Sequence, residues 1–386
     1  MLASVLRAPT SLVCSLVVGA ALACGAAVGC SGDDTETHAP PPVKVTPADY
    51  GAAYDKLSDW HFFRDPKTMT PADDLVAYDV IAPLFSDYTS KYRFIYIPEG
   101  ETIGYTDDGP WDLPVGSILV KVFSYPADVR EPDADLRLME TRVLWHEPDG
   151  WTVQTYVWND DQTEATLEVA GKTVPVEFIG PDGSNMSNDY RVPNTNECKR
   201  CHGEQVNMGE DLVEILGPRT LELDRDHDFG DGPVNQIDEF DRRGWFTSTP
   251  TAAADRQRLV DPYDDAEDLD MRVRSYLHAN CSSCHRHGGF ASQSALLLDF
   301  GSTDPDTQDA SNWGVCKIPT SADDTCDNTF DIVPGRPDLS IMICRLSTTA
   351  IETRMPPLGS KLIHKEGVAL LTEWIAAMPP AACTPP

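Results

Sequence analysis

Positive charge is scarce in this chain of 386 residues. It has 30 Lys and Arg residues against 62 Asp and Glu residues, which gives a formal net charge of -32 at pH 7. Nucleic-acid binding requires clustered Lys and Arg side chains that neutralise phosphates, so this balance excludes a nucleic-acid-binding protein. It favours instead a partner protein that presents a basic face.

Long apolar runs are missing after the first thirty residues, so the body of the sequence predicts no membrane-spanning helix. The sequence also lacks a phosphate-binding loop, a Ser-His-Asp motif and a His-rich metal motif. A hydrophobic content of 41% nevertheless excludes wholesale disorder. The length leaves room for about two or three domains, each with its own core.

Residues 1–29 have the features of a signal peptide. Arg7 is the only charge before residue 33, and small and apolar residues fill positions 11–29. The sequence that ends at Cys30 resembles a bacterial lipobox, which predicts cleavage before this cysteine and attachment of lipid to its thiol. A second such box ends at Cys24, but the polar stretch that begins directly after Cys30 favours the later one. The alternative is an uncleaved N-terminal helix.

The predicted lipid anchor makes the protein a cell-envelope lipoprotein that faces the periplasm. Ser31, in place of an aspartate, follows the anchor and favours the outer membrane, by resemblance to bacterial lipoprotein sorting. Residues 30–48 include three consecutive prolines and predict an extended tether between the lipid and the first domain.

The 11 cysteines are informative because export places them in an oxidising compartment. Two leave with the signal peptide and one carries the lipid. Four others form two identical Cys-x-x-Cys-His motifs: Cys198, Cys201 and His202, then Cys281, Cys284 and His285. In a c-type cytochrome the two thiols form thioethers with the haem, and the histidine ligates its iron. We therefore predict two covalently attached c-type haems.

A structural zinc site is the alternative reading of the same four thiols, since zinc also binds paired Cys-x-x-Cys motifs. A zinc site would not require a histidine directly after the second cysteine in both motifs. The repetition of that histidine favours haem.

The last four cysteines predict two disulfides. We expect Cys316 to pair with Cys326, closing a short acidic loop, and Cys344 to pair with Cys383 near the C-terminus. Four cysteines allow three connectivities, and free buried thiols are the alternative.

A haem that only transfers electrons needs a sixth iron ligand, for which a thioether is suited. For the second haem we predict Met355, because prolines follow it directly and its segment lies between the two expected helices of this region. Met342 and His364 are the fallback ligands. For the first haem the choice stays open, and the position could also be vacant; the candidates are Met208, His227, Met271 and His278.

The pattern of the sequence changes near residue 185. Residues 49–184 carry alternating β-formers between turn signals, with strands expected at 92–97, 118–125, 141–145, 151–158 and 165–178. Residues 185–262 and 263–386 each hold one haem motif, with helices expected at 268–280 and 366–378. We predict an α+β multidomain protein, in which an N-terminal antiparallel β domain precedes two mainly α, cytochrome-c-like haem domains.

Several segments outside the haem motifs also resemble a known protein family. They are residues 78–88, 158–162, 192–194, 230–236 and 276–280. In this order they resemble a family of poorly characterised bacterial di-haem c-type cytochromes, whose members are often encoded beside parallel β-helix repeat proteins. The resemblance covers about residues 50–378. It implies an exported electron-transfer protein, and it carries over onto the two haem motifs and the Met355 segment but not onto the insertion with Cys316 and Cys326.

The function we predict is the transfer of single electrons through two haems to an exported redox partner. A di-haem enzyme, either peroxidase-like or the haem part of a dehydrogenase, is the main alternative and would use the first haem as its reactive site. A binding module, in which the β domain recognises a protein or polysaccharide, is the third hypothesis.

Overall fold

The computed structural model describes residues 41–204, 212–320 and 326–384, which from Pro42 onward belong to one unit. The predicted signal peptide and the predicted lipid anchor Cys30 lie outside the described residues. The same is true of Met208, one of the candidate ligands of the first haem.

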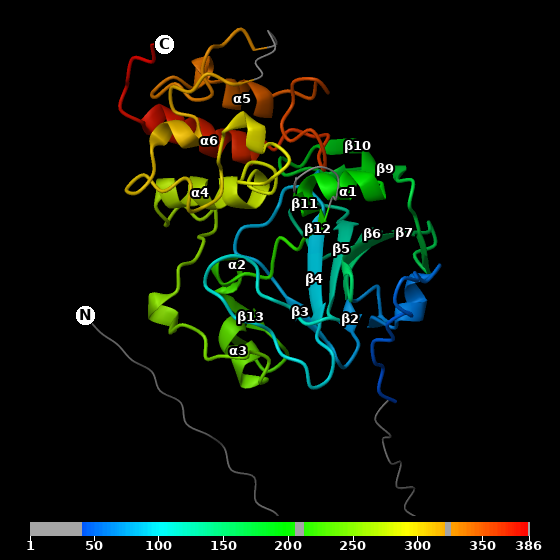
Figure 1. Cartoon of the computed structure of the whole chain (residues 1–386). Coiled ribbons are helices and arrows are strands. Elements are labelled where there is room, and N and C mark those ends of the chain that lie inside the picture. Colours follow the sequence, from blue (N-terminus) through cyan, green and yellow to red (C-terminus); the bar gives the residue numbers. More distant parts are fainter. Residues whose placement is uncertain (1–40, 205–211, 321–325, 385–386) are drawn as a thin grey trace, which may run out of the picture. The chain divides into compact units, whose positions relative to one another are not determined.

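A six-stranded antiparallel sheet forms the centre of the described chain (Figure 1). Its strands pair in the order in which they occur in the sequence: β3 (Leu75–Tyr78), β4 (Ser90–Tyr96), β5 (Ile118–Tyr125), β6 (Arg137–Glu147), β7 (Gly150–Trp158) and β8 (Ala165–Leu167). The strand predicted at 118–125 is confirmed residue for residue. The single strand predicted at 165–178 is wrong, because Gly171 turns with a φ of 76° and divides it into β8 and β9 (Lys172–Ile179).

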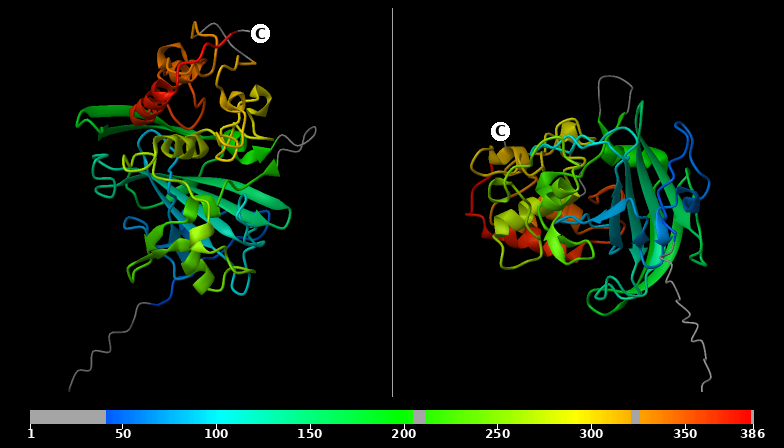
Figure 2. Two further views of the ribbon diagram at one scale, coloured as in Figure 1. Left: turned by 90° about the vertical axis from the view of Figure 1, so that its left-hand side faces the viewer. Right: turned by 90° about the horizontal axis from the view of Figure 1, so that it is seen from below.

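Both faces of this sheet are covered (Figure 2). One face packs on the segment before β3, through Trp60 and Phe62. The other face packs on residues that follow the sheet, through Ile237 and Phe240 of helix α3 (Gln236–Arg242). Because neither face meets water, the central strands are apolar on both sides, and β5 has seven buried residues out of eight.

Four two-stranded sheets accompany the central one. They are β1 (Phe63–Asp65) with β2 (Thr70–Pro71), β9 with β10 (Asn185–Val192), β11 (Gly203–Glu204) with β12 (Leu212–Val213), and β13 (Asp226–Asp228) with β14 (Pro233–Asn235). The hairpin of β9 and β10 packs on the central sheet, where its Phe178 and Tyr190 share an apolar cluster with Tyr125, Met139 and Val157.

The prediction of two mainly α haem domains is wrong. The described chain is mostly β-sheet, with about 20% helix and six α-helices. These are α1 (Thr195–His202), α2 (Thr220–Leu223), α3, α4 (Leu269–Asn280), α5 (Ile341–Leu346) and α6 (Lys365–Ala377). The physical reason is that the apolar residues of α2 and α3, among them Leu223 and Phe240, complete the core of the sheet.

Helices α4 and α6 are the two long ones, and both were predicted within one or two residues. They pack together through Val273 and Leu277 of α4 and Leu371 and Ile375 of α6. Gly367 makes the close approach possible, because a Cβ atom at this position would overlap the ring and hydroxyl of Tyr276. A larger residue there would force Tyr276 or the helices to shift.

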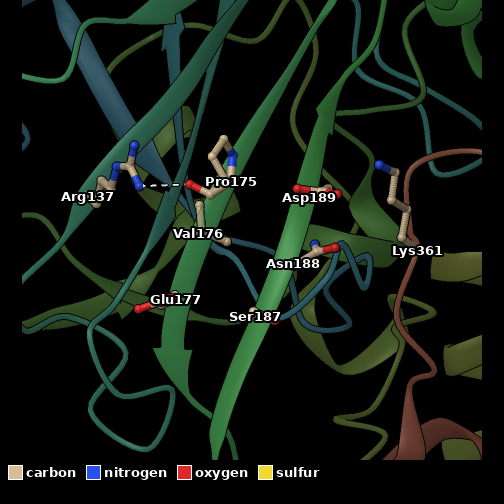
Figure 3. A pocket seen from close by; sticks show the side chains of 8 residues that line it. All are labelled: Arg137, Pro175, Val176, Glu177, Ser187, Asn188, Asp189 and Lys361. Atoms are coloured by element: carbon tan, nitrogen blue, oxygen red, sulfur yellow. Dashed lines mark hydrogen bonds between the residues drawn. The ribbon is translucent and has the colours of Figure 1, made fainter.

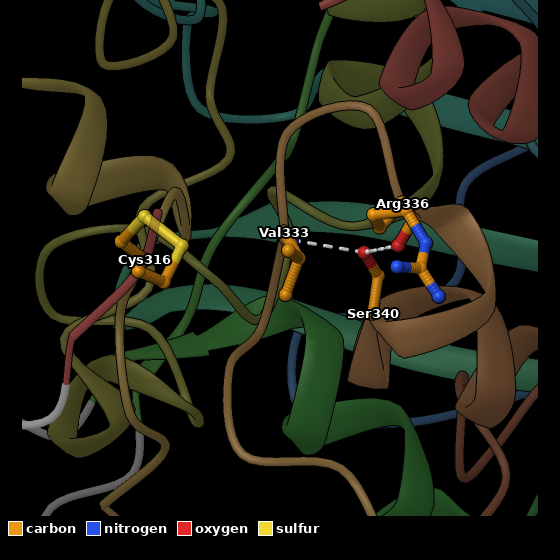
Figure 4. The surroundings of a disulfide bond; sticks show 5 residues. Cys316, Val333, Arg336 and Ser340 are labelled. Atoms are coloured by element: carbon orange, nitrogen blue, oxygen red, sulfur yellow. Dashed lines mark hydrogen bonds between the residues drawn. A yellow bond between two sulfur atoms is a disulfide. The ribbon is translucent and has the colours of Figure 1, made fainter. Parts of the chain in front are cut away.

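Two disulfides join the last four cysteines, but with a different pairing from the predicted one. Cys316 pairs with Cys383 and Cys326 pairs with Cys344. Figure 4 shows the Cys316 disulfide near the turn in which the Ser340 hydroxyl accepts a hydrogen bond from the Val333 N–H (2.9 Å). The prediction paired cysteines that follow one another in the sequence. In the structure the chain after α6 returns to the segment of Cys316, so this disulfide joins residues that are 67 positions apart.

Candidate functional site

The first Cys-x-x-Cys-His motif lies on α1. A capping box fixes where this helix begins, because the Asn194 side chain accepts from the Glu197 N–H (2.8 Å) and the Glu197 carboxylate accepts from the Asn194 N–H (2.8 Å). Cys198 and Cys201 follow at a spacing of three, which places both thiols on one face of the helix. The helix contacts β7 of the central sheet.

His202 ends α1 with its ring held in one orientation. Its Nδ1 atom lies 3.0 Å from the carbonyl oxygen of Glu214. Because a carbonyl only accepts, Nδ1 carries the hydrogen and Nε2 keeps a lone pair. Burial lowers the pKa of His202 to about 4, and the charges of Lys121 and Arg142 add to this effect, so the ring is neutral at pH 7. A neutral imidazole with a bound Nδ1–H is the state in which histidine ligates a metal.

The second motif follows directly after α4. Cys281 is the C-terminal cap of this helix, and its N–H donates to the Leu277 carbonyl (2.9 Å). The His285 N–H in turn donates to the Cys281 carbonyl (2.9 Å), which closes a turn over the whole motif. The ring of His285 repeats the arrangement of His202, since its Nδ1 lies 3.3 Å from the carbonyl oxygen of Leu296. Burial also lowers the pKa of His285.

The fold brings the two motifs into contact. The thiols of Cys201 and Cys284 interact with each other, which lowers the pKa of Cys201 and raises the pKa of Cys284. The Cys284 thiol also lies 3.5 Å from the carbonyl oxygen of Arg200. Next to them, Arg286 forms an ion pair with Glu214 (3.6 Å), so each motif is tied to the segment of the other.

The four thiols do not converge on one point. Cys198 is buried beside Glu140 and Arg142 of the sheet, whereas Cys281 packs on the apolar cluster of α4 and α6. Within the described residues no three His, Cys, Asp or Glu side chains form a group that could hold a metal ion. Each motif by itself holds two thiols and one oriented histidine, which is the set of groups that a c-type haem takes.

Met355, the predicted sixth ligand of the second haem, is half-buried. Its N–H donates to the Arg345 carbonyl (3.0 Å), and the Nε of Arg345 donates to the Thr353 carbonyl (2.9 Å). After burial, the charge of Arg345 also contributes to lowering the pKa of His285. The fallback ligand Met342, in contrast, packs against the apolar cluster of α4 and α6.

The candidate histidine ligands are held by other groups. His278 of α4 accepts from the Phe300 N–H through Nδ1 (3.2 Å), and its Nε2 lies 3.5 Å from the Glu222 carboxylate. His364 contacts the hydroxyls of Tyr263 (3.2 Å) and Tyr276 (3.1 Å) with its two ring nitrogens. Both histidines therefore have a structural role in the described chain.

The remaining two candidates for the first haem also have contacts of their own. Met271 packs in a small apolar cluster with Leu259 and Phe300. His227 lies on β13, where its ring meets Phe229 edge to face (centroids 4.8 Å apart). The structure brings neither of them into contact with the first motif.

His364 makes stability depend on pH. Its ring stacks on Phe85, and burial, with a contribution from Lys91, lowers its pKa to about 3. The unfolded chain, with a histidine pKa of about 6.5, binds more protons between these values, so stability falls as the pH falls below about 6.5. Between pH 6 and pH 5 we expect this residue alone to cost about 1 kcal/mol, measured by urea unfolding. His364→Phe should flatten this part of the pH profile, and an unchanged slope in that variant would contradict the assignment.

The prediction from sequence missed a set of charges on the sheet face that is turned toward the first motif. In the sheet register Arg93 of β4 stands opposite Lys121 of β5, which stands opposite Arg142 of β6. Lys91 lies two residues before Arg93 and points to the same face. We call these four residues, Lys91, Arg93, Lys121 and Arg142, the basic row. The sequence signal that could have revealed the basic row was the presence of charged residues at the inward positions of otherwise apolar strands.

A hollow of about 680 Å³ lies elsewhere, on the hairpin of β9 and β10 (Figure 3). Arg137 closes one side of it and donates to the Pro175 carbonyl (3.1 Å), and Lys361 lies on the other side. None of the motif residues lines this hollow, so it is separate from the candidate site.

No family model matches the sequence of this chain, and neither a curated protein nor a solved structure matches it. In the part of the chain that the structure describes, no helix has the length and apolar character needed to cross a bilayer.

Proposed function

We propose that this protein is an exported di-haem c-type cytochrome, anchored by lipid at Cys30, that passes single electrons through two covalently bound haems. The observation that carries the proposal is the contact between the two attachment motifs, in which the Cys284 thiol lies 3.5 Å from the Arg200 carbonyl oxygen, beside Cys201. Two haem sites that meet at their attachment points are arranged for exchange of electrons between them. The resemblance to bacterial di-haem cytochromes supports the same conclusion.

At each site the cysteines would attach the haem and the histidine would ligate its iron. The thiols of Cys198 and Cys201, and those of Cys281 and Cys284, would hold the porphyrins through thioethers. His202 and His285 would present Nε2 to iron, since the carbonyls of Glu214 and Leu296 occupy their Nδ1 hydrogens. When bound, the haem supplies an iron that changes oxidation state by one electron.

The redox partner should present a basic face. The net charge of -32 gives the protein a strongly negative field, which accelerates encounter with a partner of opposite charge. This attraction should weaken as ionic strength rises, because salt screens interactions between exposed charges.

Haem content and ligation test the proposal. The protein is produced together with a cytochrome c maturation system, and a pyridine haemochrome assay should give two c-type haems per chain. Spectra recorded during a redox titration should then show two low-spin haems that do not respond to carbon monoxide or peroxide. A chain that binds zinc and no haem would overturn the proposal.

A di-haem enzyme is the second candidate, and one observation favours it. The three described candidates for the sixth ligand of the first haem, His227, Met271 and His278, are all engaged in other contacts or lie apart from the first motif. An open iron at this site would bind small ligands. The di-haem enzyme would be favoured over the electron-transfer protein if one haem were high-spin and bound carbon monoxide while the other were low-spin and did not.

Met355→Ala tests the ligation of the second haem. The variant should lose the absorption band of a methionine-to-iron bond at the red end of the spectrum, and the potential of one haem should fall because a thioether ligand raises it. The matched control is Met342→Ala, which removes a methionine that packs in the core and should keep the band. An unchanged spectrum of Met355→Ala refutes this ligand.

A further inference from the structure

The basic row is a cluster in space as well as in sheet register. Three of its members lie over the buried ring of Phe123, whose centroid is 4.3 Å from Cζ of Arg142, 5.0 Å from Nζ of Lys121 and 6.0 Å from Nζ of Lys91. Contacts of this kind stabilise a cation without neutralising it. The basic row therefore gathers four basic side chains at one place in a very acidic protein.

The carboxylates near the basic row do not balance it. Asp79 is shared between Arg93 and Arg225 (both 3.2 Å). Glu140 is fully buried and binds Arg142 through two hydrogen bonds of 2.8 and 2.6 Å. These pairs leave the two lysines of the row without a carboxylate of their own.

The two lysines have weak partners or none. Lys91 donates to the Thr89 carbonyl (2.8 Å), and the nearby Asp87 already accepts from the N–H groups of Lys361 and Leu362. Within the described residues the ammonium of Lys121 has no hydrogen bond or ion pair; it lies over the face of Phe123 and is attracted by the charge of Glu140, which Arg142 already binds. Burial and the repulsion of the neighbouring cations lower the pKa of Lys91 to about 7 and lower that of Lys121 strongly. An anion in this place would remove that repulsion.

The first motif lies within electrostatic reach of the row. Helix α1, which carries this motif, contacts β7, and Arg142 stands opposite Thr155 of β7 in the sheet register. The charge of Arg142 also acts on the pKa of the Cys198 thiol, against the larger effect of burial. Lys121, which lacks an anionic partner, and Arg142, which is paired with Glu140, are thus the members of the row that act on the site where the first haem would be attached.

We propose that the basic row binds the propionate carboxylates of the haem attached at Cys198 and Cys201, an inference that rests on the proposed function. Each haem brings two propionates, and Lys121 is the cation near the first motif that lacks a carboxylate partner. Lys and Arg form strong, charge-assisted hydrogen bonds to carboxylates. The central sheet thereby gains a role in the site: it supplies the counter-charge for a cofactor that is bound covalently by the segment after it.

Lys121→Met tests this proposal, because methionine keeps the length and apolar stem of the side chain and removes its charge. The purified protein, with its haem content measured first, is titrated with a redox mediator between about pH 5 and pH 8. We expect one of the two potentials to fall, since a nearby positive charge favours the reduced haem. The same potential should also become dependent on pH, because a propionate without its cation takes up a proton in this range.

The matched control is Lys172→Met, which removes the same charge from an exposed position on β9 and should leave both potentials unchanged. Unchanged potentials in Lys121→Met would overturn the inference. A fall without any new pH dependence would overturn it as well, because it would mean that the lysine acts on the iron from a distance and does not bind a propionate. A wild-type protein without two haems would instead refute the proposed function, so the two failures are distinguishable.

Discussion

Replacing Glu140 with alanine should lower the free energy of unfolding by about 3–5 kcal/mol. The carboxylate is fully buried, binds Arg142 with two hydrogen bonds and accepts a third from the Tyr190 hydroxyl (2.6 Å). Removing it leaves a guanidinium and a hydroxyl without their acceptor inside the protein, and each then bears its full cost of desolvation. Urea unfolding followed by circular dichroism measures the change.

The control for this prediction is Asp338→Ala. Asp338 and Arg336 form an ion pair with the same separation of 2.6 Å, but both side chains are more than half exposed. Exposed pairs contribute little because water screens them, so the unfolding midpoint should hardly move. Equal effects of the two substitutions would show that burial does not set the strength of the Glu140 pair.

Replacing Cys281 and Cys284 together with serine should halve the covalently bound haem. Serine cannot form the thioether, so the second motif loses its haem while the first motif keeps both of its thiols. The pyridine haemochrome assay should fall from two haems to one per chain. Mass spectrometry of the denatured protein should show a loss equal to one haem, a result that does not depend on the stability of the variant.

The double variant Cys326→Ser, Cys344→Ser serves as its control. It removes two cysteines from the same part of the chain, but these two form a disulfide. We expect this variant to unfold more easily, because a cross-link that limits the unfolded chain is lost, and to keep two haems. Loss of haem from this control, or two haems in the first variant, would contradict the assignment of the motifs.

Local patterns in the sequence were enough to place the regular elements. Strand β5 and the helices α4 and α6 were predicted almost to the residue, because alternation and helical spacing are properties of the segment itself. The fold class was wrong because it depends on where apolar residues pack. Leu223 and Phe240 could have built a small haem domain, and in the structure they complete the core of the sheet.

In the candidate site, too, local patterns could be predicted and tertiary packing could not. The two Cys-x-x-Cys-His motifs are local, so their spacing alone identifies them. The contact between Cys201 and Cys284, the disulfide partner of Cys316 and the clustering of the basic row are all set by tertiary packing. Lys121 reads in the sequence as one charge in an apolar strand, and only the register with Arg93 and Arg142 shows that it belongs to a cluster.

The order of the strands bears on how the molecule assembles. Every pairing in the central sheet joins strands that are consecutive in the sequence, and its hydrogen-bonded ladder ends at Leu167. Such nearest-neighbour pairings close short loops and form early, and a chain is synthesised from its N-terminus. We therefore expect the strands to pair first, with Lys121 and Arg142 still in water, and the later segments to complete the core and cover these charges afterwards.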